Sequence, residues 1–130
     1  MTYQTAFPDF DRAAEIDELI AAGWQDQSWH NDGCPRLHCG RSVLWIDYLD
    51  QAKSEIAAMG GESGQCLIEF VEADDGLSFP TIKEALGAFY VERIGYDPFA
   101  DDPAITIAEV ARTLVEHQAE ADALFSEMLA

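Results

Sequence analysis

The sequence predicts a two-layer α+β domain, in which a small antiparallel sheet of two to four strands packs against an N-terminal helix and two C-terminal helices. Three observations support this class: an amphipathic segment near the N-terminus, two short runs of strand-like alternation in the middle, and two helix-capping motifs towards the C-terminus. With 130 residues, 48% of them hydrophobic, the chain has the size of one domain and enough apolar material for one core. We therefore expect residues 1–130 to form a single acidic domain.

The first predicted helix covers about residues 10–22. Its apolar side chains Ile16, Leu19 and Ile20 share one helical face, and acidic side chains occupy the other. Gly23 stands where a glycine commonly terminates a helix. This pattern is typical of a helix that lies on a core with one face in solvent.

Two strands are predicted, at about 42–48 and 65–72, because apolar side chains alternate there with a period of two. In the first, Val43, Trp45 and Asp47 point to one side, and the intervening apolar residues point to the other. Both sides are largely apolar, so this strand should be central in the sheet. The turn formers at 74–76 should follow the second strand. The sequence leaves open whether 34–41 is a strand and whether 49–64 contains a short helix.

Two helices should complete the chain, each opening with the S/T-x-x-E capping motif. Thr81 with Glu84 begins the first, and Gly95 suits its end. Thr106 with Glu109 begins the second, although the Asp-Pro pair at 102–103 offers an earlier start. The apolar stripe expected to be buried on the first of these helices consists of Ile82, Leu86, Phe89 and Tyr90.

The charge is extreme for a chain of this size. There are 25 acidic and 7 basic residues, which gives a formal net charge of −18. This balance argues against direct binding of nucleic acid or of an anionic membrane, because both require a cationic surface. No segment has a secretory signal or a membrane-spanning run, and the three cysteines suit a reducing compartment, so we expect a cytoplasmic protein.

The last predicted helix carries an acidic row. At 100° per residue, Glu109, Glu116, Glu120 and Glu127 fall on one side, opposite Val110 and Leu114. A solvated face is the plain interpretation, but the row also resembles the phosphate spacing of a DNA strand. The acidic residues Asp97, Asp101 and Asp102 extend this charge into the preceding loop. We predict that these seven residues bind a basic partner.

Residues 30–41 form a second candidate region, because they hold two of the three histidines and two of the three cysteines. Imidazole and thiolate are preferred zinc ligands, so His30, Cys34, His38 and Cys39 are candidate metal ligands. Their spacing matches no common zinc motif, and the neighbouring residues 38 and 39 would diverge on a strand. Our expectation is therefore no metal and no cofactor, with the cysteines buried as small apolar residues.

The sequence evidence for a catalytic site is weaker than the evidence for a metal site. A Cys34 or Cys39 thiol beside His30 or His38 lacks any recognisable orienting group. Asp47 and Glu69, on neighbouring predicted strands, could act as an acid–base or metal pair, but no accompanying lysine supports this. The three tryptophans could line a ligand pocket, although core positions are commoner for them. We expect a protein that is not an enzyme.

The run Ser-Trp-His-Asn-Asp-Gly-Cys-Pro at 28–35, followed by the strand Val-Leu-Trp-Ile-Asp-Tyr-Leu-Asp, carries a resemblance. It is similar to short uncharacterised bacterial proteins of plasmids and phages that have a W-x-N-D-x-C-P turn before a hydrophobic strand. The resemblance covers about residues 24–50 and implies a mobile-element setting. In that setting, small acidic proteins often inhibit host defence by mimicking DNA.

The leading hypothesis is thus a non-enzymatic acidic module that binds a basic protein surface. In its sharpest form it is a DNA mimic that inhibits a DNA- or RNA-binding defence complex of the restriction or CRISPR type. Two alternatives stay open: a small metal- or ligand-binding domain that uses the segment 30–39, and a housekeeping or immunity-type interaction module. The exposed last helix could also support a homodimer.

Overall fold

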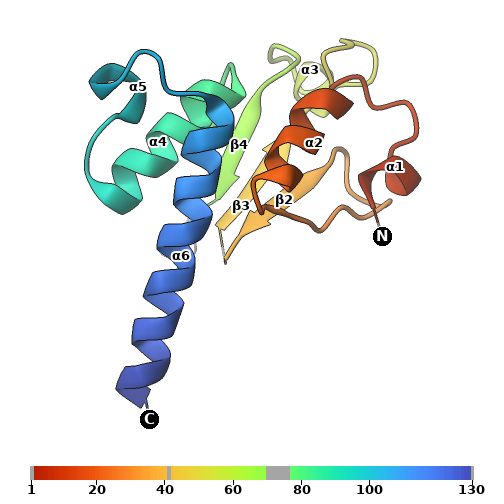
Figure 1. Ribbon diagram of the computed structural model, residues 1–130. Helices are drawn as coiled ribbons and strands as arrows, with labels where there is room; N and C mark the ends of the chain where they lie inside the picture. Colours follow the sequence, from red (N-terminus) through yellow and green to blue (C-terminus); the bar gives the residue numbers. More distant parts are fainter. Residues whose placement is uncertain (1, 41, 70–76, 130) are drawn as a thin grey trace.

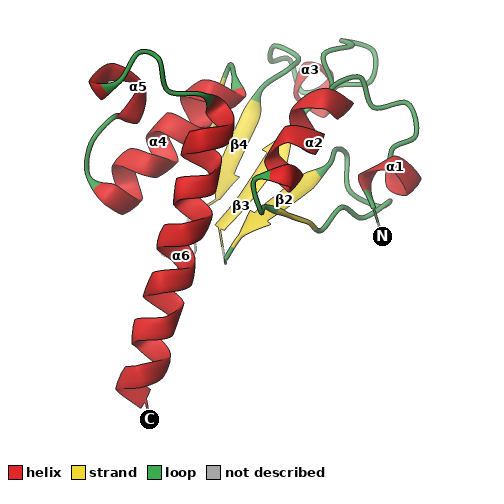
Figure 2. Cartoon of the chain, viewed as in Figure 1, coloured by secondary structure: helices red, strands yellow, loops and turns green. Residues whose placement is uncertain are grey.

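A sheet and a layer of helices make up the α+β fold, shown in the computed structural model of Figures 1 and 2. The structure describes residues 2–40, 42–69 and 77–129, with side chains described as far as residue 120. The described strands are β1 (Gln25–Asp26), β2 (Arg36–Cys39), β3 (Ser42–Ile46), β4 (Cys66–Glu69) and β5 (Leu77–Phe79). The described helices are α1 (Tyr3–Ala6), α2 (Ala13–Ala21), α3 (Glu55–Ala58), α4 (Ile82–Ile94), α5 (Pro98–Asp101) and α6 (Ile107–Leu129). The predicted class is confirmed.

The sheet is an antiparallel meander in the order β1-β2-β3-β4-β5. Our range of two to four strands is therefore wrong. The two edge strands, β1 and β5, have only two and three residues, too few for an alternation pattern to reveal them. β3 lies in the centre, as predicted. Part of the second predicted strand, at 70–72, and the turn at 74–76 lie outside the described residues.

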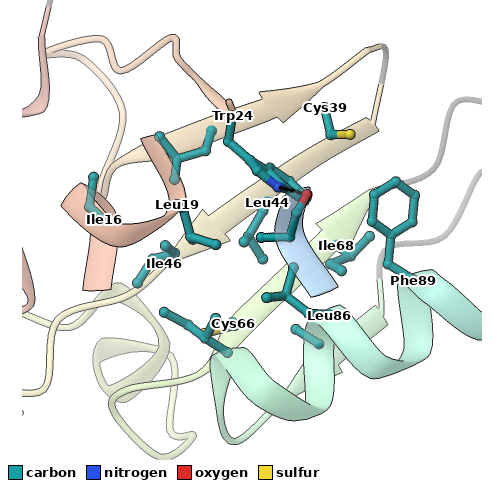
Figure 3. Close-up of a cluster of buried hydrophobic side chains, with 14 of the residues drawn as sticks. Ile16, Leu19, Trp24, Cys39, Leu44, Ile46, Cys66, Ile68, Leu86 and Phe89 are labelled. Carbon is teal, nitrogen blue, oxygen red and sulfur yellow. Dashed lines mark hydrogen bonds between the residues drawn. The ribbon is translucent and has the colours of Figure 1, made fainter. Parts of the chain in front are cut away.

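The core lies between the sheet and α2, α4 and α6. Alternate residues of β3 and β4, Leu44 and Ile68 among them, turn towards these helices and are almost fully buried. Figure 3 shows the helical side chains that meet them, including Ile16, Leu19, Leu86 and Phe89. Trp24 joins this core and donates a hydrogen bond from Nε1 to the carbonyl of Ala111 in α6, at 3.1 Å. The predicted apolar stripe Ile82, Leu86, Phe89 and Tyr90 of α4 is therefore buried in the core, as are Ile16 and Leu19 of α2.

α2 begins three residues later than predicted and ends as predicted. Gly23, at φ 112°, follows the last turn, and the N–H groups of Gly23 and Trp24 donate to the carbonyls of Ile20 and Leu19. These bonds satisfy carbonyls that the helix leaves unpaired. The predicted buried face is wrong at Ile20, whose side chain is 37% exposed, because the core contacts stop at the Ile16 and Leu19 side of the helix.

Both capping threonines act as predicted. The hydroxyl of Thr81 accepts the N–H of Glu84 at 3.1 Å, and the hydroxyl of Thr106 accepts the N–H of Glu109 at the same distance. The earlier start at residues 102–103 is wrong, because α5 ends at Asp101 and a turn separates it from α6. Figure 1 shows the C-terminal half of α6 extending away from the sheet and the other helices. No helix in the described ranges has the length and apolar character needed to cross a membrane.

Candidate functional site

The sheet face that turns away from α2, α4 and α6 carries the most distinctive site. Trp45 of β3 and Leu67 of β4 are register partners on this face, and both side chains are half-buried. Asp47 follows β3 on the same side, and its N–H donates to the carbonyl of Gln65, which prolongs the pairing with β4. Glu69 ends β4 on this face. An aromatic ring, an aliphatic side chain and two carboxylates are thus placed together by strand alternation alone.

A cavity of about 400 Å³ lies over this face. One wall is the loop 31–34, and the other is α3 with the following Met59. The Glu55 carboxyl group lies against the Gly33 backbone so closely that a Cβ at Gly33 would be 1.7 Å from its Cδ. Glycine at position 33 therefore gives the Glu55 carboxylate its place between the two walls.

The Asp47 side chain is the most unusual group in the cavity. It is 2% exposed, and its Oδ2 accepts a short hydrogen bond from the hydroxyl of Ser54. Its Oδ1 has no hydrogen-bond partner among the described residues, and the same holds for the buried Nε1 of Trp45. A buried polar atom without a partner costs about 1–3 kcal/mol, so a ligand that supplies a donor to Asp47 Oδ1, or an acceptor to the indole N–H of Trp45, would be favourable here.

Cys34 lies in the same cavity but is poorly suited to act as a nucleophile. Burial raises the pKa of its thiol to about 12, and the charges of Asp47, Glu55 and Asp32 add to the shift. The thiol therefore stays protonated at neutral pH, and the reactive thiolate is not formed. This argues against the thiol chemistry considered for the segment 30–39.

The four candidate metal ligands of that segment are dispersed. Cys39 points into the core and is 3% exposed, whereas its neighbour His38 lies on the opposite sheet face. Burial, followed by the charge of Arg36, lowers the pKa of His38. His30 is exposed and packs on Trp29, with ring centroids 4.4 Å apart, and Cys34 lies in the cavity. Within the described residues, no group of three or more His, Cys, Asp or Glu side chains could hold a metal ion.

The acidic row on α6 is the second candidate site. Glu109, Glu116 and Glu120 are exposed, while Val110 and Leu114 on the opposite side are buried in the core. No ion pair to these three carboxylates is present in the described part of the chain, although Arg112 lies on the same helix. α6 includes position 127, but the Glu127 side chain is outside the described residues. The row is therefore accessible, and no ion pair within the described residues neutralises it.

The three acidic residues before α6 have differing local contacts. Asp97 caps α5, because its Oδ1 accepts the N–H groups of Phe99 and Ala100. Asp102 accepts the N–H of Ala104 at 3.0 Å. Both are exposed, as is Asp101. Two of these carboxylates thus shape the turn, which is a sufficient structural reason for their presence.

The sequence does not predict the wall of the cavity that α3 forms. Ser54 and Glu55 lie in the segment 49–64, for which the sequence alone does not decide between helix and loop, and nothing in their spacing relates them to β3. The hydroxyl of Ser54 also accepts the N–H of Ala57 and so caps α3. The sequence feature that indicates a site here is an acidic residue, Asp47, beside Trp45 on one side of a central strand, where apolar residues are usual.

Comparisons with protein-family models, with curated proteins and with solved structures find no match for this chain. The resemblance to plasmid and phage proteins therefore stays a prediction.

Proposed function

We propose that the protein is a non-enzymatic acidic module that binds a basic surface of another protein, and that Glu109, Glu116 and Glu120 form the centre of its interface. The proposal rests on the observation that these three carboxylates are exposed and have no ion-pair partner among the described residues, on the outer side of a helix whose inner side is anchored in the core. A rigid, preformed row loses little conformational entropy on binding. Glu127 and the acidic residues at 97, 101 and 102 extend the proposed interface.

In its sharpest form the proposal is DNA mimicry in the cytoplasm of a bacterial host. A rise of 1.5 Å per residue sets Glu109 and Glu116 about 10 Å apart along the axis, and Glu116 and Glu120 about 6 Å apart. Phosphates of one DNA strand advance about 3.4 Å along the axis, so these steps match about every second and every third phosphate. With a net charge of −18, the chain would be attracted at long range to the cationic groove of a nucleic-acid-binding protein and would compete with its DNA.

The test is capture of a partner from bacterial lysate on immobilised protein, followed by elution in a salt gradient and by competition with a 20-base-pair duplex. The row variant carries Glu109→Gln, Glu116→Gln and Glu120→Gln. The matched control carries Glu18→Gln, Glu62→Gln and Glu92→Gln, three exposed positions that lie outside α6 and outside the acidic row. Both have a net charge of −15, that is, −18 plus three neutralised carboxylates.

We expect the wild type and the control variant to capture a nucleic-acid-binding protein, and moderate salt or the duplex to release it. The row variant should not capture this protein. Equal retention by the two variants would show that only total charge matters and would reject the row as the interface. A partner that resists both salt and DNA would favour an interaction module of a different kind.

A further inference from the structure

The cavity over Trp45 combines several carboxylates with the absence of any cationic lining residue. Asp32, Asp47, Glu55 and Glu69 contribute to its lining, and none of the described lining residues is Lys, Arg or His. A concave, partly apolar site lined by charge of one sign concentrates ligands of the opposite sign. The site therefore selects for a cation.

The nearest basic side chains of the described chain leave three of the four carboxylates without an ion pair, although Arg36 lies at the edge of the cavity beside Asp32 and Trp45. Arg36 donates from Nε to the Gln27 carbonyl at 2.7 Å, and the same nitrogen lies 3.7 Å from Asp32. Arg12 reaches Asp47 only at the backbone, where its Nη1 donates to the carbonyl at 3.1 Å. Among the described residues, the carboxylates of Asp47, Glu55 and Glu69 have no ion-pair partner. A cation from outside would meet unneutralised charge.

Asp47 gives the site a fixed acceptor. Its hydrogen bond with Ser54 orients the carboxylate, and its free Oδ1 belongs to a side chain that is 98% buried, since 2% is exposed. Such an acceptor is preorganised, because nothing in the described chain competes for it. A charged donor forms the stronger class of hydrogen bond with a carboxylate.

The remaining walls indicate the shape of the cation. Trp45, Leu67, Ile56 and Met59 provide apolar surface, which suits an alkyl stem more than a hydrated inorganic ion. No three candidate metal ligands of the described residues come together, so a metal ion would lack a complete shell. Tryptophan is the best aromatic partner for a cation, and the Trp45 ring already has the Arg36 guanidinium 5.6 Å from its centroid.

We propose that this cavity binds an alkylguanidinium group, with the guanidinium donating to Asp47 Oδ1 beside Trp45 and the alkyl stem packed on Leu67 and Ile56. A guanidinium is favoured over a primary ammonium because it is planar, stacks on aromatic rings and is more weakly hydrated. The site lies on the sheet face opposite α6, so the proposal is independent of the acidic row and either can fail alone.

The experiment is a titration of the ¹⁵N-labelled full chain, followed through the indole N–H signals of its tryptophans. Butylguanidinium represents a free small molecule, acetyl-Gly-Arg-Gly-amide represents an arginine of a protein, and butylurea is the neutral isostere. Assignment uses Trp45→Phe. The internal control is Trp24, whose indole N–H is held by Ala111 in the core.

We expect saturable movement of the Trp45 signal with butylguanidinium, no movement of the Trp24 signal, and at least about tenfold weaker binding of butylurea. Asp47→Asn should weaken butylguanidinium binding about tenfold while Glu92→Gln, at an exposed position elsewhere, leaves it within about twofold. If Asp47→Asn does not fold, Glu69→Gln at its exposed position serves instead, with an expected loss of about threefold.

Equal binding of the tripeptide and butylguanidinium would support the site with protein arginine as the source, and binding of butylguanidinium alone would support it with a free small molecule. Absence of a saturable Trp45 shift with either cation would overturn the proposal. So would equal affinity for butylurea, or an affinity that neither carboxylate variant changes.

Discussion

Arg12 donates a hydrogen bond from Nη1 to the carbonyl of Gly64 at 2.8 Å, across 52 residues of chain. The same nitrogen donates to the carbonyl of Asp47, and Nη2 pairs with Glu15 at 2.9 Å. The side chain of Arg12 is 4% exposed, so these bonds form in a largely dry environment. One guanidinium thus connects the residue before α2 to Asp47, which follows β3, and to Gly64, which precedes β4.

Replacing Arg12 by Met should therefore destabilise the fold by about 3 kcal/mol, because two buried carbonyls lose a charged donor. Urea unfolding followed by circular dichroism measures this change. The matched control is Lys53→Met, which removes an exposed cation paired with Asp9 at 3.8 Å and should cost under about 0.5 kcal/mol. Equal losses in the two variants would show that Arg12 acts only through net charge.

The contact between Gly33 and Glu55 leads to a second prediction. At Gly33 an added Cβ lacks space, whereas at Gly23 the positive φ would also strain the backbone. Gly33→Ala forces the Glu55 carboxyl group away, but this group ends a flexible and exposed side chain, so the stability loss should stay below about 1 kcal/mol. The expected effect is on the cavity: the displaced carboxylate weakens butylguanidinium binding about threefold.

Gly23→Ala is the contrasting variant. Gly23 has φ 112°, and an added Cβ would meet Val115 at 3.1 Å, so about 1–2 kcal/mol should be lost without an effect on the cavity. Thermal unfolding of both variants, with the titration described above, distinguishes the two cases. A large stability loss in Gly33→Ala would mean that Glu55 cannot move and that its placement is part of the fold.

Much of the layered fold could be predicted because helix signals are local. Thr81, Thr106 and Gly23 act through bonds within a few residues, and the sequence contains both partners. The cavity could be predicted only in part. Alternation placed Trp45 and Asp47 on one side of a strand, but the loop 31–34 and α3 reach them through tertiary packing, which has no periodic signal. The buried Arg12 was missed for the same reason, since its acceptors are distant carbonyls.

The buried thiols predict a specific loss of stability in alkaline solution. Burial raises the pKa of Cys34 to about 12 and that of Cys66 to about 11, from an ordinary value of 9.0. Below about pH 8 both thiols are protonated in the folded and unfolded chains, so they cause no pH dependence there. Above pH 9 the unfolded chain loses protons that the folded chain retains, so stability falls as pH rises, by up to about 1.4 kcal/mol per pH unit and thiol.

Urea unfolding at pH 7, 8, 9 and 10 checks this trend. Stability should be nearly constant up to pH 8 and should then decrease. Between pH 9 and pH 10, Cys34→Ala should reduce the decrease by about a third, because Cys66 and the tyrosines whose pKa is also raised, Tyr3, Tyr48 and Tyr90, contribute the rest. An unchanged slope in Cys34→Ala would mean that other groups, such as Tyr3 and Tyr90 with their raised pKa, cause the alkaline loss. The truncation in Cys34→Ala lowers the free energy of unfolding by the same amount at every pH, so only the difference in slope between the variant and the wild type reports the thiol.

The net charge of −18 predicts that salt stabilises the isolated chain. Self-repulsion of the folded state weakens as the screening length falls from about 30 Å at 0.01 M to about 10 Å at 0.1 M. We expect the melting temperature to rise by about 4 °C over this range, equivalent to about 1 kcal/mol. A variant that combines the six Glu→Gln changes of the row and control sets has a net charge of −12, from −18 plus six, and should show a smaller rise. An equal rise in both proteins would indicate specific ion binding.

Because salt should strengthen the fold, release of a captured partner by salt would report the interface and not unfolding of the module.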